Sequence, residues 1–169
     1  YPGTYTENID ISRANLELRS ASGNPEDTII VSNNTGKDVI SVKSRANSKI
    51  KGFTISGAGT GHSGISLDTC RDCTIEDNKF LNDGMGVSIK SSPNSVVRNN
   101  TATKTSDIGT GRGIYILQSS PTTILSNTIS NQQYGIYIAG SQSNTVSGNT
   151  VTQSSSNGIE LESANNNNV

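Results

Sequence analysis

The chain has 169 residues, which is enough for one ordinary domain, but only 30% of them are hydrophobic and none is tryptophan, so a thick globular core is not expected. The 13 basic and 14 acidic residues nearly balance, which argues against nucleic acid and against a polybasic membrane contact as partners. No stretch is long and apolar enough for membrane insertion, and any export signal is expected to have been removed before residue 1.

Residues 1–57 predict short strands without a regular repeat. The segments "TENIDI", "NLELRS", "TIIVS" and "DVISV" alternate apolar and polar residues, as half-buried strands do. The segment "IKGFTIS", residues 50–56, fits the second and third strands of the later repeats. We therefore expect irregular first turns within a single domain that covers residues 1–169.

A repeat governs residues 58–169. A glycine followed by an apolar-polar-apolar triplet recurs as "GISL", "GVSI", "GIYI", "GIYI" and "GIEL", in steps of 22, 27, 22 and 23 residues. A second short apolar segment follows each triplet, a third follows in the first four repeats, and no helical periodicity appears. Three strands per repeat predict an all-β fold, a right-handed parallel β-helix (β-solenoid) of about seven turns of about 22 residues.

Residues one repeat apart should be neighbours at about 4.8 Å, so their side chains stack in columns. The 27-residue step places an insertion within residues 104–112, which we expect to protrude as a loop. The predicted inward columns are Ile65, Val87, Ile114, Ile136 and Ile159; Leu67, Ile89, Ile116, Ile138 and Leu161; and Ile75, Val97, Ile124, Val146 and Val169.

Four asparagines recur at one corner of the predicted coil. Each precedes the third strand of its repeat, and stacked amides there can bond to the turn backbone and to one another. We interpret this column as a structural ladder without a binding role. Its members are Asn78, Asn100, Asn127 and Asn149.

The sequence resembles the NosD-type and carbohydrate-associated right-handed β-helix families of secreted and cell-surface proteins, including archaeal envelope and sheath-like proteins. The resemblance spans essentially the whole chain, on "YPGTYTENIDI", "SKIKGFTISG" and the repeated "GIYI" cycle. It implies the fold and an extracellular or cell-surface location, but such families include lyases, hydrolases, esterases, epimerases and non-catalytic proteins. In the family, a capping segment and a further strand precede "PGTYTEN"; neither is present here.

The best candidate for a catalytic group is Glu76 and Asp77 with Arg98, and Asp72 or Asp83 could lie near it. Clustered carboxylates are what sugar hydrolysis or elimination needs. Opposite charges one repeat apart are also ordinary sheet stabilisation. The motifs of pectin esterases, polygalacturonases and mannuronan epimerases do not appear, so the sequence favours a protein that is not an enzyme.

The single histidine, His62, lies in the glycine-rich "SGAGTGHSG", where we expect a solvated loop residue and no metal site. No cofactor is implied. Cys70 and Cys73 form one "CRDC" in the turn between the first and second strands of a repeat. This spacing leaves open whether they bridge each other, bridge neighbouring subunits or form no bond.

Tyr115 and Tyr137 should stack on the outer face of the coil. Such a pair can bind sugar rings or simply stabilise the sheet, and we keep both interpretations. Asn33 and Asn99 begin "NNT" sequences, which are candidate glycosylation sites in an exported protein.

Both ends of the predicted coil lack caps, because Val169 falls on an inward column and Tyr1 begins without a capping segment. Uncapped ends predict an excised piece of a larger protein or head-to-tail contact with copies of itself. The leading hypothesis is a non-catalytic exported structural protein that assembles end to end into a cell-surface layer (S-layer), sheath or fibre. The alternatives are a carbohydrate-binding module that takes polysaccharide, and a polysaccharide lyase or hydrolase built around Glu76, Asp77 and Arg98.

Overall fold

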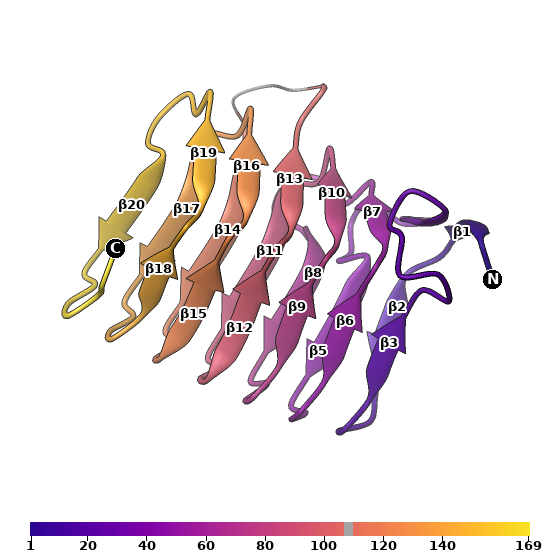
Figure 1. Ribbon diagram of the computed structural model, residues 1–169, viewed down its shortest axis with the longest axis horizontal. Helices are drawn as coiled ribbons and strands as arrows, with labels where there is room; N and C mark the ends of the chain where they lie inside the picture. Colours follow the sequence, from indigo (N-terminus) through magenta and orange to yellow (C-terminus); the bar gives the residue numbers. More distant parts are fainter. Residues whose placement is uncertain (107–109) are drawn as a thin grey trace.

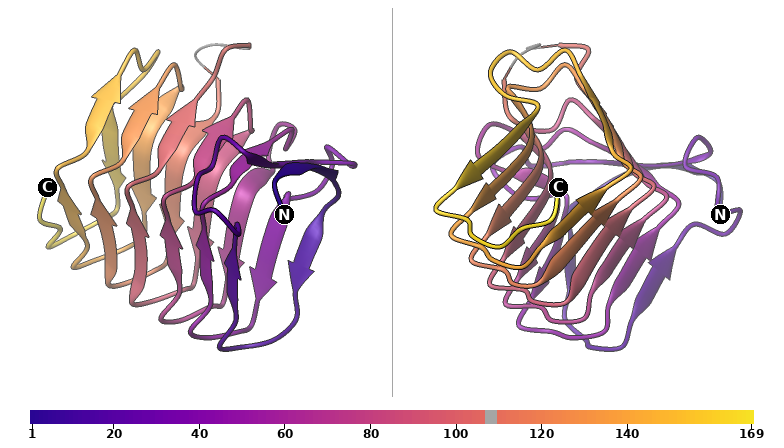
Figure 2. Two further views of the ribbon diagram at one scale, coloured as in Figure 1. Left: turned by 45° about the vertical axis from the view of Figure 1, so that its right-hand side comes forward. Right: turned by 60° about the vertical axis from the view of Figure 1, so that its left-hand side comes forward.

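The computed structural model describes residues 1–106 and 110–169 and confirms the predicted all-β coil (Figure 1). Its strands form three parallel sheets, which we call A, B and C, with seven, seven and six strands within the described residues. Each turn supplies one strand to each sheet, and the turns stack one behind another around a single interior (Figure 2). Among these residues there is no helix that could cross a membrane.

The strands of each sheet follow one another at intervals of one turn. Sheet A contains β1 (Gly3–Thr6), β4 (Thr28–Val31), β7 (Thr54–Ser56), β10 (Lys79–Leu81), β13 (Thr101–Thr103), β16 (Thr128–Ser130) and β19 (Thr150–Thr152). Sheet B contains β2 (Ile9–Ile11), β5 (Ile40–Lys43), β8 (Ser63–Asp68), β11 (Met85–Lys90), β14 (Arg112–Leu117), β17 (Tyr134–Ala139) and β20 (Ile159–Glu162). Sheet C contains β3 (Glu17–Arg19), β6 (Lys49–Lys51), β9 (Thr74–Glu76), β12 (Ser95–Arg98), β15 (Thr122–Leu125) and β18 (Thr145–Ser147).

The strand register confirms the predicted inward columns. Ile114 pairs with Val87 on one side and with Ile136 on the other, and all three side chains are buried. Because side chains alternate between the two faces of a strand, a slip of one residue would turn these columns outward. The aliphatic interior therefore fixes the register of every turn.

In the first four repeats, the glycine that begins the repeat is required by close packing where sheet B meets sheet A. A Cβ atom on Gly113 would lie 2.4 Å from Ile129 Cγ2 and 2.7 Å from the carbonyl oxygen of Gly135. On Gly135 it would lie 2.2 Å from Val151 Cγ1. The sheet B backbone thus passes directly over the inward side chains of sheet A, and only glycine leaves room for them.

The four asparagines lie in a ladder at the corner between sheets C and A. Asn100 Nδ2 donates to Asn127 Oδ1 at 3.0 Å, and Asn127 Nδ2 donates to Asn149 Oδ1 at 2.9 Å. The same carboxamides reach the backbone, as in the 3.0 Å bond from Asn127 Nδ2 to the carbonyl oxygen of Val97. Each amide therefore satisfies polar groups in two successive turns.

A second ladder, of serines, occupies the corner between sheets B and C and was not predicted from the sequence. Ser92 Oγ accepts the backbone N–H of Cys70 at 2.8 Å, and Ser119 Oγ accepts that of Ser92 at 2.9 Å. Ser141 Oγ continues the series by accepting the N–H of Ser119 at 3.0 Å. The hydroxyl at this position serves the same purpose as the asparagine amide at the other corner.

The predicted insertion falls in the connection from β13 to β14, residues 104–111, between sheets A and B. Residues 107–109 of this connection lie outside the described residues, so the protruding loop stays a prediction. All five connections from sheet A to sheet B in residues 57–158 occur at this corner and differ in length. They are residues 57–62, 82–84, 104–111, 131–133 and 153–158.

Replacing Asn127 by alanine should lower the free energy of unfolding by about 2–3 kcal/mol, because several buried backbone and amide groups lose their partner at once. Thermal and urea melts followed by circular dichroism measure this change. Asn165→Ala, at an exposed asparagine, is the matched control and should change stability by less than about 0.5 kcal/mol. Equal effects of the two substitutions would show that the ladder does not stabilise the coil.

Candidate functional site

A cluster of three tyrosines and one arginine forms the most distinctive outer surface of the coil, on β14 and β17 of sheet B. Tyr115 and Tyr137 are paired in register, and their rings stack with centroids 5.5 Å apart and an interplanar angle of 16°. Tyr134 adds a third ring, with its centroid 5.1 Å from that of Tyr137. We call Arg112, Tyr115, Tyr134 and Tyr137 the tyrosine platform.

Arg112 lies at the centre of the platform. Its guanidinium carbon is 4.8 Å from the ring centroid of Tyr115, 4.9 Å from that of Tyr137 and 5.7 Å from that of Tyr134. Cation–π attraction at such distances holds a cation against the rings. The arginine therefore fixes the arrangement of the rings and also places hydrogen-bond donors beside them.

A carboxylate completes the edge of the platform. The hydroxyl of Tyr137 donates a hydrogen bond to Glu162 on the neighbouring strand β20. This bond, together with partial burial and the negative charge of Glu162, raises the pKa of Tyr137 to about 12. The phenol consequently stays protonated at neutral pH, and the platform offers aromatic faces, cationic donors and a carboxylate acceptor within one surface.

Sequence reasoning placed Tyr115 and Tyr137 together but missed Arg112 and Tyr134. Both precede the glycine of their repeats, in "RGIYI" and "YGIYI". They are paired in register with each other, as are Tyr115 and Tyr137. Because Arg112 and Tyr134 both occupy the position before the glycine of their repeat, the repeat alone would have predicted that they lie side by side next to Tyr115 and Tyr137.

Glu76 lies on the outer face of sheet C between two cations. Lys49 Nζ is 2.5 Å from Glu76 Oε1, and Arg98 donates to Glu76 Oε2 from Nε at 2.8 Å and from Nη2 at 2.6 Å. The glutamate side chain is only 5% exposed. Burial alone would raise the pKa of Glu76, but the bonds and charges of Lys49 and Arg98 outweigh it and lower the pKa. The carboxylate is therefore held ionised by a structural clamp.

The other carboxylates named with Glu76 do not join it. Asp77 is exposed at the following corner, and Asp72 accepts a hydrogen bond from Asn94 at the corner between sheets B and C. Asp83 is buried at the corner between sheets A and B, where its Oδ1 accepts the N–H of Ala58 at 2.8 Å. The coil thus separates these groups onto different corners, and Lys49 is the partner of Glu76 that the sequence did not indicate.

His62 lines an open polar cleft of about 370 Å³ together with Asp10, Asp38 and Lys43. Its Nδ1 is 4.0 Å from Asp38 Oδ1. Within the described part of the chain, no three histidine, cysteine, aspartate or glutamate side chains are grouped as metal ligands would be. This cleft therefore offers polar groups for hydrogen bonds.

Cys70 and Cys73 form a local disulfide, with an S–S distance of 2.01 Å. Both residues are fully buried at the corner where the serine ladder begins. Their burial leaves no sulfur at the surface for a bridge to a neighbouring subunit. Asn33 and Asn99, the two candidate glycosylation sites, are both exposed.

Three parallel sheets wound into one coil place the chain among the parallel β-helix proteins. Residues 4–169 match the family described as periplasmic copper-binding protein (NosD), and the chain belongs to this family. Among solved structures, it is similar to a candidate glycosyl hydrolase from Parabacteroides merdae ATCC 43184, at 13% identity and a TM-score of 0.38, covering 97% of this chain and 79% of that one. No curated protein matches the chain.

The donor set of this chain does not fit a copper centre. Copper prefers thiolate, thioether and imidazole ligands, but both cysteine sulfurs are joined in the disulfide. His62 is the single histidine and Met85 the single methionine of the sequence. Asp38 lies beside His62, but the described residues contain no group of three or more histidine, cysteine, aspartate or glutamate side chains that could hold a metal ion. The residues present therefore supply no copper chemistry.

Glu76→Gln should lower the free energy of unfolding at pH 7 by about 1–3 kcal/mol, because Lys49 and Arg98 lose a charged acceptor. The folded-state pKa of Glu76 lies below its ordinary value of 4.5, so its contribution is present above about pH 4.5 and is lost as the pH falls through the folded pKa. The difference between the two proteins in melting experiments should therefore shrink towards pH 3.

Glu26→Gln is the control for this experiment. Glu26 pairs with Lys79 at 2.8 Å, but its side chain is 63% exposed, so its loss should cost less than about 1 kcal/mol. A pH-independent effect of Glu76→Gln would contradict the proposed clamp.

Proposed function

We propose that this β-helix is an exported, non-catalytic polysaccharide-binding protein whose sugar site is the tyrosine platform. The observation that carries the proposal is the stack of Tyr115 and Tyr137, with Arg112 within 4.9 Å of both ring centroids. Two half-exposed rings on a sheet surface present a broad apolar area. The stacked rings would then bind a sugar in addition to stabilising sheet B.

The chemistry of the platform suits a sugar. The C–H faces of a pyranose ring pack against an aromatic face, while its hydroxyl groups need donors and acceptors at the edge. Arg112 supplies donors, and the carboxylate of Glu162 beside Tyr137 supplies acceptors. Because β14, β17 and β20 lie side by side along the coil axis, several sugar units of a polysaccharide could lie across them.

Export is part of the proposal and has two supports. The family description places its members in the periplasm. The disulfide between Cys70 and Cys73 is of a kind that persists in oxidising compartments outside the cytosol. Placement at the cell surface is the finer proposal and would follow if the ligand is an envelope polysaccharide.

The double variant Tyr115→Ala, Tyr137→Ala should weaken polysaccharide binding by at least about tenfold, since each ring contributes on the order of 1 kcal/mol of contact. Affinity electrophoresis of the purified chain through gels that contain a panel of plant, bacterial and algal polysaccharides measures this loss. A hydrolysed ligand would show new reducing ends in the same samples.

Tyr5→Ala is the matched control, because Tyr5 is also exposed but lies in β1, far along the coil from the platform. It should leave retention unchanged. Retention that survives the double variant, or no retention on any polysaccharide, would overturn the proposal.

End-to-end assembly of copies remains a second proposal, and β20 (Ile159–Glu162) is the edge at which it can be tested. Ile159 and Leu161 continue the inward columns but are 39% and 43% exposed. A further turn, contributed by a longer chain or by a second copy, would bury them and pair the open edge of β20. Such contacts between copies would produce a layer, sheath or fibre.

Light scattering of the purified chain over a rising concentration series tests this assembly. If copies join at β20, the mean mass should increase with concentration, and Leu161→Asp should abolish the increase because a charge would be buried at the contact. Leu125→Asp, at an exposed leucine on β15, is the control. A monomer at every concentration would rule out self-assembly of this chain.

A further inference from the structure

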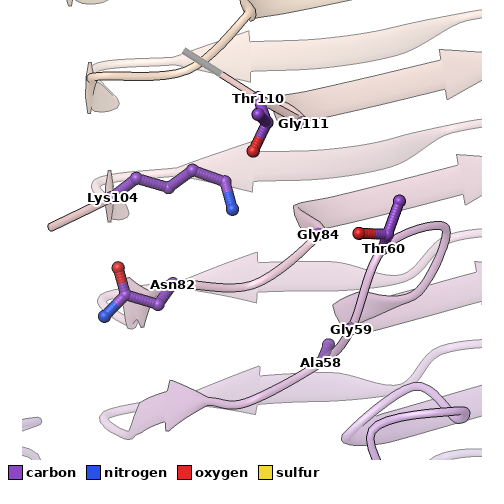
Figure 3. Close-up of a pocket in the computed structure, with 8 residues that line it drawn as sticks. All are labelled: Ala58, Gly59, Thr60, Asn82, Gly84, Lys104, Thr110 and Gly111. Carbon is purple, nitrogen blue, oxygen red and sulfur yellow. The ribbon is translucent and has the colours of Figure 1, made fainter. Parts of the chain in front are cut away.

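A pocket of about 450 Å³ opens at the corner between sheets A and B (Figure 3). Three glycines from consecutive turns, Gly59, Gly84 and Gly111, line it. A Cβ atom on Gly84 would lie 2.2 Å from the carbonyl oxygen of Gly59, and one on Gly111 would lie 3.1 Å from Lys104 Cε. Glycine at these positions therefore lets the backbones of successive turns approach closely and leaves room for the lysine side chain.

Lys104 is the charged group of the pocket. The residue is only 5% exposed, and in Figure 3 its side chain extends towards Thr60 and Thr110 on the opposite side of the pocket. Within residues 1–106 and 110–169, none of the ion pairs includes Lys104. A buried cation without an anionic partner is costly, so the site favours a ligand that brings a negative charge.

Asp83 is the nearby carboxyl that could balance Lys104 from inside the coil. Its Oδ1 is committed to the N–H of Ala58, and its buried Oδ2 has no hydrogen-bond partner. Burial raises the pKa of Asp83 well above its ordinary value, against the smaller opposing effects of the Ala58 bond and of Lys104. Within the described residues, no ion pair joins Asp83 to Lys104, so the ammonium can meet an anionic group that enters the pocket.

We propose that this pocket binds a small carboxylate of about monosaccharide size, such as a uronate, with Lys104 as the partner of the carboxylate. The volume of about 450 Å³ lies in the range of small-molecule sites. An ammonium–carboxylate hydrogen bond is among the stronger polar contacts in proteins. Thr60, which also lines the pocket, supplies a hydroxyl group for the polar remainder of the ligand.

The proposal does not depend on sugar binding by the tyrosine platform. The two sites share no residue, although Gly111 of the pocket directly precedes Arg112 of the platform. Loss of one site is therefore expected to leave the other intact, and the platform variant Tyr115→Ala, Tyr137→Ala should still bind the carboxylate.

Titration with sodium galacturonate, followed by amide chemical shifts of the full chain, tests the pocket. Shifts should concentrate at residues 58–60, 82–84 and 110–111, whereas galactose and sodium chloride at matched ionic strength should not produce them. Lys104→Met should raise the dissociation constant at least about tenfold through loss of the charged contact. Thr60→Val, which removes one hydroxyl without changing side-chain shape, should raise it about threefold.

Thermal melts separate a ligand-binding lysine from a structural one. If Lys104 is buried without a partner, Lys104→Met should melt at the same or a higher temperature than the natural chain. Asp83→Asn should retain galacturonate binding, and Lys90→Met, at an exposed lysine of sheet B, should be unchanged. A marked loss of stability in Lys104→Met, equal binding of galactose, or no shifts at the pocket would overturn the proposal.

Discussion

Each polar group buried in this coil needs a hydrogen-bond partner, and because neighbouring turns are in direct contact, the turn before or after it can supply one. The two regular corners meet this requirement in different ways. Asparagine amides connect successive turns between sheets C and A, and serine hydroxyls do so between sheets B and C. Either ladder forms only if every turn has the same length at that corner. The polar ladders and the aliphatic columns therefore require the same register between successive turns.

The corner between sheets A and B does not meet the requirement. Asp83 Oδ2, Gln132 Oε1 and Ser154 Oγ are buried there without a hydrogen-bond partner. Each of these residues lies two positions beyond the end of a sheet A strand, so the same place in three turns repeatedly leaves polar atoms unsatisfied. A buried polar group without a partner costs free energy, so a ligand that forms a hydrogen bond to it gains binding energy. The pocket with Lys104 lies at this corner, and the platform begins directly after it.

Spacing alone predicted the features that repeat strictly. Ile114 and Asn127 could be assigned to a column and a ladder because the strands and the tight corner preserve the period on both sides of them. The Lys104 pocket could not be predicted, because side-chain direction past a strand end depends on the loop. By register with Lys79 and Thr101, Lys104 corresponds to Asn82, yet Lys104 is buried while Asn82 is half-exposed and bonds to Thr105. Lys49 was missed beside Glu76 because the register places Lys49 opposite Thr74 and Lys51 opposite Glu76, and the Lys49 side chain reaches the carboxylate diagonally across the strands.

At the corner between sheets A and B, the connections can change in length while the residues that maintain the fold stay the same. Its connections range from residues 82–84 to residues 104–111, while the inward columns on either side of them keep their register. A longer or shorter loop can therefore be accepted here without disturbing a single ladder. This corner is therefore suited to loop insertion. A foreign recognition loop inserted between β16 and β17, at residues 131–133, would lie beside the tyrosine platform and leave the three sheets unchanged.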